Sequence, residues 1–246
     1  MLSDSDKQII SKLKTEYPEA YDFFERHEAE HRELLKKGCH DIRNIVTLLS
    51  GSYQLLGLTN PQLNTIPRFV TMGNDIKSLV KAFNDIALFR YASTLSPTDT
   101  NISELKPMLL EYISNNYADF LDDINIACDA DNTFMCIDAP RLVNAVGCLI
   151  ANATEASDFS TQINIDIKLF DENTLGISVK NHGKCPSPDI ADKLLLPFCT
   201  DKQEHLGLGL AIAAETADAM NGNVSWEHSD DGFTCFTILV SSALHQ

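Results

Sequence analysis

Basic residues are scarce in this chain, and that scarcity narrows what it can bind. Its 246 residues include 19 Lys and Arg against 35 Asp and Glu, which gives a formal net charge of −16 at pH 7. Proteins that bind nucleic acids or anionic membranes need clustered positive charge to meet phosphate groups. The composition therefore predicts a protein that has neither nucleic acid nor a membrane surface as its partner.

Long apolar runs and paired cysteines are also missing. No apolar run approaches the roughly 18 residues that cross a bilayer, and the start, MLSDSDKQIISK, lacks the apolar segment of a signal peptide. The seven cysteines are scattered, odd in number and never in a CxxC pair. Such free thiols suit a reducing cytosol, where they act as small apolar fillers. The expected location is the cytoplasm.

Helical periodicity dominates the first part of the sequence. One helix is expected over residues 21–58, and Pro61 and the residues before it interrupt the pattern ahead of a second helix over residues 66–92. Two antiparallel helices with apolar seams cannot bury those seams alone, so a four-helix bundle made by a homodimer is expected. The seam of the first helix repeats at three- and four-residue steps through Cys39, Ile42, Val46, Leu49, Tyr53 and Leu56.

The pattern changes after a linker expected at residues 96–99. Helices are expected over residues 102–117, 140–156 and 208–220, and strands over residues 124–128, 133–137, 163–170, 175–179, 223–227 and 233–240. The fold class is therefore α+β, with an N-terminal helical hairpin followed by a C-terminal α/β sandwich. The expected domains are residues 1–95 and 96–246.

The segment GCHDIRN, residues 38–44, carries the most distinctive chemistry of the first helix. His40 and Asn44 lie one turn apart on the same face, beside the apolar seam. An imidazole near neutral pH is a nucleophile, and the carboxylate of Asp41 can orient the ring and take up its proton. For these residues alone, a solvated His-Asp pair on a helix surface is the simpler interpretation. Whether His40 is instead a nucleophile has to be judged from the motifs of the second domain.

In the second domain, an amide and a glycine-rich segment are candidates for holding phosphate. Asn152 lies on a helix that is otherwise apolar around it. A buried amide needs partners, which a Mg²⁺-bound phosphate would supply, although capping of a neighbouring loop is an equal alternative. Gly207 and Gly209, in GLGLA, open a helix and would let backbone N–H groups approach a polyphosphate. A tight loop packed on a helix would use the same glycines.

Together and in this order, these segments resemble the sensor histidine kinases of two-component systems, over nearly the whole chain after about residue 25. The matches are His40 in the H-box, Asn152 in the N-box, Asn181 and Gly183 in the adenine-reading G1 box, Phe198 in the F-box, and Gly207 with Gly209 in the G2 box. The resemblance implies a dimerisation and phosphotransfer domain followed by an ATP-binding domain of the GHKL type.

The resemblance also implies roles for single residues. His40 would take a phosphoryl group from ATP, with Asp41 as orienter and base and Asn44 beside them. ATP and Mg²⁺ are the implied cofactors, with Asn152 as the metal ligand. The implied partners are an Asp of a response-regulator receiver domain and, because no sensor domain is recognised, a separate sensor protein. The implied nucleotide-binding residues are Asn152, Asn181, Gly183, Phe198, Lys202, Gly207 and Gly209.

Several positions depart from the family pattern. Asn181 stands where the G1 box has an Asp; its amide keeps an acceptor oxygen and also has N–H donors, which a carboxylate lacks. The segment between Thr200 and Gly207 is very short. These changes leave open an alternative, a histidine phosphotransferase or scaffold with a degenerate nucleotide site that relays phosphoryl groups between receiver domains. The departures are Ile45 for Pro, Cys148 for the first N-box Asn, Asn181 for Asp, Cys185 for the second G1 glycine, and His205-Leu206 for Gly-Thr.

One competing motif points to a different class of enzyme. His27-Glu28-Ala29-Glu30-His31 fits the HExxH pattern of zinc proteases, in which two ligands lie one turn apart and a Glu acts as base. Here the motif lies in a charged helical stretch, and no third ligand motif follows it. A solvated helix face is the favoured interpretation.

Overall fold

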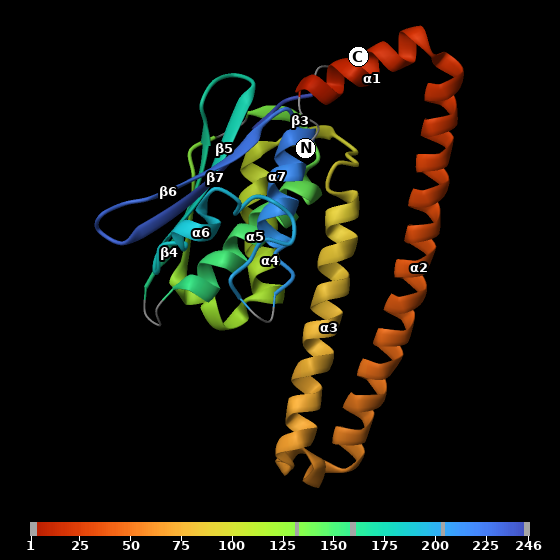
Figure 1. Cartoon of the computed structure of the whole chain (residues 1–246). Coiled ribbons are helices and arrows are strands. Elements are labelled where there is room, and N and C mark those ends of the chain that lie inside the picture. Colours follow the sequence, from red (N-terminus) through yellow and green to blue (C-terminus); the bar gives the residue numbers. More distant parts are fainter. Residues whose placement is uncertain (1–3, 131–132, 158–160, 203–204, 244–246) are drawn as a thin grey trace. The chain divides into compact units, whose positions relative to one another are not determined.

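The computed structural model (Figure 1) describes residues 4–130, 133–157, 161–202 and 205–243, without the side chains of residues 4–8, 28, 31–32 and 35–36. The chain divides into two compact units, Met1–Ala87 and Leu88–Gln246. Each unit has its own architecture, helical in the first and α/β in the second. The functional boundary expected between residues 95 and 96 remains a prediction.

Three helices make up the first unit: α1 (Asp4–Glu16), α2 (Pro18–Thr59) and α3 (Pro67–Tyr91), of which α3 continues into the second. Pro18 lies in the first turn of α2, where its missing N–H has no partner to lose. The short 3₁₀ helix η1 (Pro61–Thr65) separates α2 from α3, because a proline disfavours helix in the residue before it. Both long helices expected from the sequence are confirmed.

Helices α2 and α3 meet close to η1. The Tyr53 hydroxyl donates a hydrogen bond to the Phe69 carbonyl at 3.0 Å, and the two rings stack with centroids 4.4 Å apart. Gly73 leaves room for this tyrosine, since a Cβ there would lie 2.3 Å from its hydroxyl oxygen. The Asn64 amide also donates to the Gly57 carbonyl at 3.3 Å. These contacts close the end of the helical hairpin.

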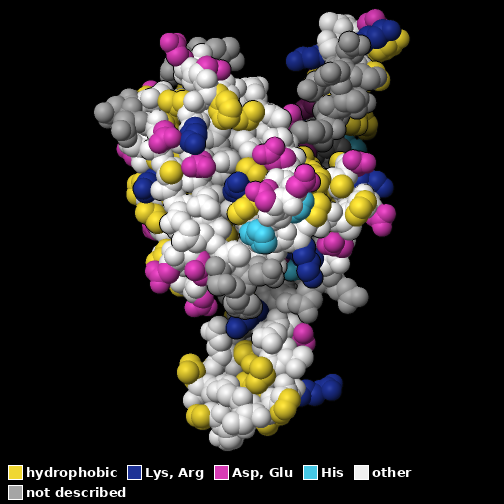
Figure 2. Space-filling view, turned by 90° about the vertical axis from the view of Figure 1, so that its left-hand side faces the viewer, with side chains coloured by type: hydrophobic (Ala, Val, Ile, Leu, Met, Phe, Trp, Pro, Cys, Tyr) yellow, Lys and Arg dark blue, Asp and Glu magenta, His cyan; other side chains and the backbone are white. Residues whose placement is uncertain are grey.

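Much of the apolar surface of α2 is exposed in the single chain. Val46 is buried, but hydrophobic side chains lie at the surface of the hairpin's closed end, at the bottom of Figure 2. Large exposed apolar patches mark interaction surfaces. This exposure supports the dimeric bundle, which remains a proposal. The exposed apolar residues of α2 from Ile42 onward are Ile42, Ile45, Leu48, Leu49, Leu55, Leu56 and Leu58.

The second unit is built on a five-stranded sheet with the order β2-β4-β5-β7-β6. Strands β2 and β4 are parallel, and the other neighbours are antiparallel. The strands are β2 (Ile124–Cys128), β4 (Ile163–Leu169), β5 (Thr174–His182), β6 (Asn223–His228) and β7 (Phe233–Ser241). A separate antiparallel pair joins β1 (Thr98–Asn101) to β3 (Phe134–Ile137).

Helices α4 (Leu105–Asn116), α5 (Ala139–Ala156) and α7 (Gly209–Ala219) cover one face of this sheet (Figure 1). The hydrophobic core lies between the helices and the sheet. Asp138 caps α5, because its carboxylate accepts the N–H of Arg141 at 3.0 Å and that of Ser96 at 2.7 Å. The remaining short helices are η2 (Ile102–Glu104), η3 (Ala118–Asp123) and α6 (Pro188–Ala191).

The expected α+β architecture is confirmed, with one correction. Thr98 and Asp99, expected to be part of a linker, instead begin β1 and pair with β3. Ser96 is also held, through its bond to Asp138. All seven cysteines are free, but none is fully buried as an apolar filler would be: six are half-buried and Cys185 is exposed. Among the described residues, no helix has both the length and the apolar character that crossing a membrane requires.

Candidate functional site

Asn181 is buried at the end of β5 because it continues the inward-facing row of that strand. Side chains alternate along a strand, and Leu175, Ile177 and Val179 already face the helices. Asn181 is only 2% exposed, and its Nδ2 has no hydrogen-bond partner within the described ranges. A buried donor without an acceptor costs about 1–3 kcal/mol. This amide is therefore ready for an acceptor from outside the chain.

Gly183 brings the end of α5 close to this amide. A Cβ at position 183 would lie 2.2 Å from the Ala156 carbonyl oxygen and 3.1 Å from Asn181 Nδ2. Only glycine allows such an approach. Ser157, which follows α5, pairs with Gly183 in an isolated bridge, and its hydroxyl is also buried without a partner in the part of the chain that the structure describes. Two unpartnered polar groups thus lie beside one glycine.

The turn between β6 and β7 borders the same edge. The Gly183 N–H donates to the Gly232 carbonyl at 3.1 Å. The pKa of the neighbouring Asp231 carboxyl is lowered, first by a hydrogen bond from the Ser229 side chain and to a smaller extent by the charge of Lys180. A negative charge is thus favoured on this exposed turn.

The loop that leads into α7 is closed by Phe198 and Gly207. The Phe198 N–H donates to the Gly207 carbonyl at 3.1 Å, and both residues have a positive φ, 63° and 65°. A Cβ at position 207 would lie 2.7–2.8 Å from backbone atoms of Cys199. At Gly209, by contrast, a Cβ would meet only Cys148 Cβ, at 3.8 Å. Gly207 is therefore required by the loop itself, while Gly209 begins α7, whose N-terminal N–H groups favour an anion.

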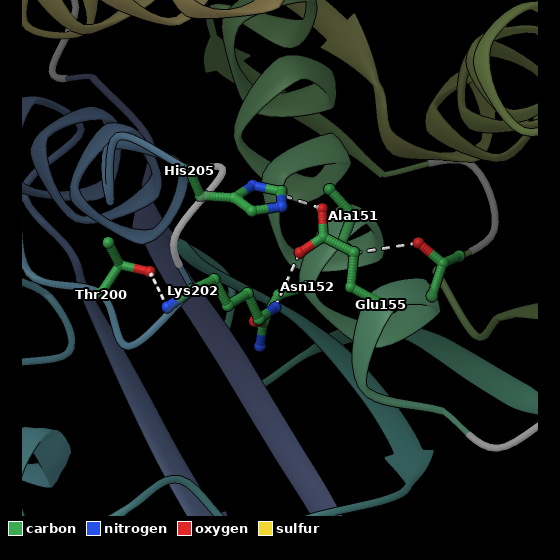
Figure 3. A network of polar contacts seen from close by, with 7 residues as sticks. Ala151, Asn152, Glu155, Thr200, Lys202 and His205 are labelled. Atoms are coloured by element: carbon green, nitrogen blue, oxygen red, sulfur yellow. Dashed lines mark hydrogen bonds and ion pairs between the residues drawn. The ribbon is translucent and has the colours of Figure 1, made fainter. Parts of the chain in front are cut away.

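A polar network joins this loop to α5 (Figure 3). Glu155 lies between Lys202 and His205: its carboxylate is 2.7 Å from Lys202 Nζ and 3.7 Å from His205 Nδ1. Lys202 Nζ also lies 3.5 Å from Asn152 Oδ1. Within the loop, the backbone N–H of Lys202 donates to the Thr200 hydroxyl at 3.1 Å. A cation from the loop thus already meets two oxygen-bearing side chains of α5.

Asn152 itself differs from the sequence expectation. It was expected to be buried and short of partners, but it is only partly buried and contacts Lys202. The reason is that Asn152 faces the loop, whereas the inward side of α5 is formed by residues such as Leu149 and Ala153. Among the residues that the structure describes, the buried side-chain amide without a partner is that of Asn181.

The residues present fit a nucleotide and Mg²⁺. Asn181 offers a buried, unpartnered donor, and Gly207 keeps the loop free of side-chain bulk beside the start of α7. Lys202 supplies positive charge, and the Asn152 amide supplies the kind of oxygen ligand that Mg²⁺ takes. The exposed ring of Phe198, at 68%, lies on the same loop.

His40 lies on the exposed surface of α2, with both of its polar contacts on the same ring nitrogen. His40 Nδ1 is 3.6 Å from Asp41 Oδ1 and 3.3 Å from Asn44 Nδ2. When Nδ1 carries the proton, Asp41 can take it and Nε2 keeps its lone pair for attack. When Nδ1 instead accepts from Asn44, the proton sits on Nε2 and the ring is not a nucleophile there. Asp41 and Asn44 therefore favour opposite tautomers of His40.

The HExxH motif lies partly outside the described residues, because the side chains of Glu28 and His31 are not described. His27 is exposed on α2, and its ring stacks on Phe23 with centroids 6.1 Å apart. Among the described residues, no group of three or more His, Cys, Asp or Glu could hold a metal ion. The helical, charged setting is the one that the sequence led us to expect.

Sequence reasoning did not single out Glu155, Thr200 and Ser157. Glu155 follows Asn152 by three residues, and this spacing places two helical residues on one face. That spacing could have identified it. Ser157 had no such signal, because its position depends on the bridge with Gly183.

Comparisons with known proteins agree with this arrangement. Residues 137–243 match the family model of the histidine kinase-, DNA gyrase B- and HSP90-like ATPases. The sensor protein VanSC of Enterococcus gallinarum is 24% identical over 221 residues, which cover 83% of this chain and 60% of that protein. The chain is thus similar to sensor proteins of this kind over most of its length, and residues 137–243 match the ATPase family. It spans less than two thirds of the length of this relative.

Solved structures of histidine kinases share the fold. The crystal structure of full-length ShkA in complex with AMPPNP superposes with a TM-score of 0.68 at 21% identity, covering 86% of this chain and 46% of that one. The histidine kinase AdeS of Acinetobacter baumannii gives a TM-score of 0.56 at 16% identity, covering 82% of this chain and 98% of its own. The segment that matches the ATPase family model, residues 137–243, contains the Asn152, Asn181 and Gly207 regions described above.

Proposed function

We propose that this chain is an ATP-dependent protein-histidine kinase of the cytoplasm that phosphorylates His40. It would work as a homodimer and pass the phosphoryl group to an Asp of a response-regulator receiver domain. The observation that carries the proposal is Lys202, a loop cation held beside Asn152 in a domain of this ATPase family.

The nucleotide would lie along the residues already described. Asn181 and Gly183 would face the base, and Gly207, Gly209 and Lys202 would face the phosphates, where backbone N–H groups and one cation offset negative charge. Mg²⁺, which Asn152 would hold, neutralises phosphate charge when it is bound. Phe198 would lie on the rim of the site. Catalysis of this kind is mostly positioning and charge neutralisation.

The chemical step uses the Nδ1-protonated tautomer of His40. Its Nε2 lone pair forms a bond to the γ-phosphorus, the bond from that phosphorus to the β,γ-bridging oxygen breaks, and ADP leaves. Asp41 takes up the Nδ1 proton as the ring becomes positive. In the second step a receiver carboxylate attacks the same phosphorus and the N–P bond breaks, while Asp41 returns its proton to Nδ1, so that neutral His40 is regenerated.

The phosphorylated residue can be tested with labelled ATP. We expect the chain to acquire γ-phosphate that is acid-labile and base-stable, and His40→Gln to abolish the label because no other group takes its place as nucleophile. His27→Gln, another exposed histidine of α2, is the matched control and should keep the label. Equal labelling of the wild type and His40→Gln would show that the histidine is wrongly assigned.

The nucleotide site can be tested by calorimetry with AMPPNP and Mg²⁺. The short loop and the substituted glycine boxes lead us to expect weak binding, with Kd on the order of 0.1–1 mM. Asn152→Ala should abolish the Mg²⁺-dependent part, because the metal's charge dominates such a site. The exposed Asn223→Ala is the control. No heat at millimolar ligand, with His40 still accepting phosphoryl from a phosphorylated receiver, would leave the phosphotransferase alternative.

A further inference from the structure

The buried amide of Asn181 is a donor that the described chain leaves without an acceptor. Its Nδ2 lies next to the position that a Gly183 side chain would occupy, and so does the Ala156 carbonyl oxygen. Buried side-chain donors in folded proteins nearly always have partners. An unpartnered donor at this place therefore points to an external acceptor, and under the proposed function that acceptor is a nucleobase.

Position 6 of a purine distinguishes two kinds of base by the direction of a hydrogen bond. Adenine carries an amino group, which donates, whereas guanine and hypoxanthine carry O6, which accepts. A carboxylate only accepts, so it favours adenine and repels an O6. A primary amide has both an oxygen acceptor and N–H donors. Asn181 can therefore pair with either kind of base by presenting Oδ1 or Nδ2.

We propose that the base site takes 6-oxopurine nucleoside triphosphates as well as ATP, with Asn181 as the residue that permits it. Nδ2 of Asn181 would donate to O6 of a guanine or hypoxanthine base, and Oδ1 would accept from the amino group of adenine. This inference rests on the proposed nucleotide-binding function and narrows its substrate class. The buried hydroxyl of Ser157, free to donate or accept beside Gly183, fits the same dual requirement.

Competition binding to the full chain tests the proposal. A fluorescent trinitrophenyl-ATP probe is bound in the presence of Mg²⁺, and ATP, ITP or GTP is added to displace it. ITP tests position 6 alone, because hypoxanthine lacks the 2-amino group of guanine. In the wild type we expect the Kd of ITP to lie within tenfold of that of ATP. In Asn181→Asp, ITP should weaken at least tenfold relative to ATP, because the acceptor-only carboxylate faces O6.

Each result of this experiment has one meaning. A wild type that binds ATP but discriminates against ITP by more than tenfold overturns the relaxed base specificity and leaves the kinase proposal standing. If the ratio of the ITP Kd to the ATP Kd in Asn181→Asp equals that of the wild type, and circular dichroism verifies the fold, another residue reads position 6. Failure of ATP, ITP and GTP alike to displace the probe overturns the nucleotide-binding function itself. Asn223→Ala should reproduce the wild-type ratio.

Discussion

Gly207 and Gly209 are two residues apart, yet they meet different physical demands. Gly207 has a φ of 65°, and a Cβ there would press on the Cys199 backbone. A non-glycine residue is strained in that conformation whatever space surrounds it. Gly209 lies at the start of α7, where an added methyl group would only touch Cys148.

We therefore predict opposite effects on stability for two matched substitutions. Gly207→Ala should lower the free energy of unfolding by about 1–3 kcal/mol, because it adds backbone strain and a clash. Gly209→Ala should be neutral or stabilise by up to about 1 kcal/mol, because alanine favours helix over glycine. Urea unfolding followed by circular dichroism measures both. Equal losses in the two variants would contradict the assignment of the strain to Gly207.

The sequence could predict which residue types this site contains, but not how each is satisfied. Asn152 and Asn181 are both amides in motif positions, one on a helix and one on a strand, and neither motif shows which of them has a hydrogen-bond partner. Asn181 continues the inward-facing row of β5, while Asn152 faces a loop that supplies Lys202. Hydrogen-bond satisfaction depends on segments far apart in the chain, so a motif cannot fix it.

At the scale of elements, Glu155 holds the loop after Phe198 against α5. Two residues of that loop, Lys202 and His205, approach the same carboxylate. A partly exposed ion pair of this kind contributes only about 0–1 kcal/mol to the stability of the whole fold. We therefore expect this ion pair to keep the loop ordered and to have little effect on the stability of the sheet.

Hydrogen exchange can show this local effect. In Glu155→Gln we predict faster amide exchange in the loop, including the Lys202 amide, because the charge that holds Lys202 is gone. Amides of β7 should exchange as in the wild type. Glu172→Gln, on the exposed turn between β4 and β5, is the control. Faster exchange throughout the unit would mean that Glu155 supports the core rather than the loop.

Most helices and strands followed from periodicity alone. The apolar steps of α2 and the alternation of β4, β5 and β7 are local signals, so their bounds came within a few residues. Strand β1 was missed because Pro97, Thr98 and Asp99 have turn composition, and only pairing with β3 makes them a strand. Helix α6 is a single turn, too short to show a period.

At the scale of the whole molecule, the exposed apolar face of α2 predicts self-association. We expect a dimer in sedimentation at micromolar concentration, because the exposed apolar side chains of α2 would otherwise remain in contact with water. Leu49→Glu, at a seam position that is 48% exposed, should weaken the dimer at least tenfold. Leu110→Glu, at 41% exposure on α4, is the matched control. A compact monomer in the wild type would contradict the prediction.

The parallel pairing of β2 with β4 has a consequence for the order of assembly. Parallel neighbours cannot be joined by a tight turn, so the chain between them makes a crossover that contains β3 and α5. Closing that long segment loses chain entropy before the contacts between the paired strands contribute any favourable free energy. Such a step is therefore slow. Asn152 and Glu155 both lie on α5, within this crossover. Formation of the phosphate end of the site is therefore coupled to the slow pairing of β2 with β4, whose partners Ile124 and Ile163 are 39 residues apart.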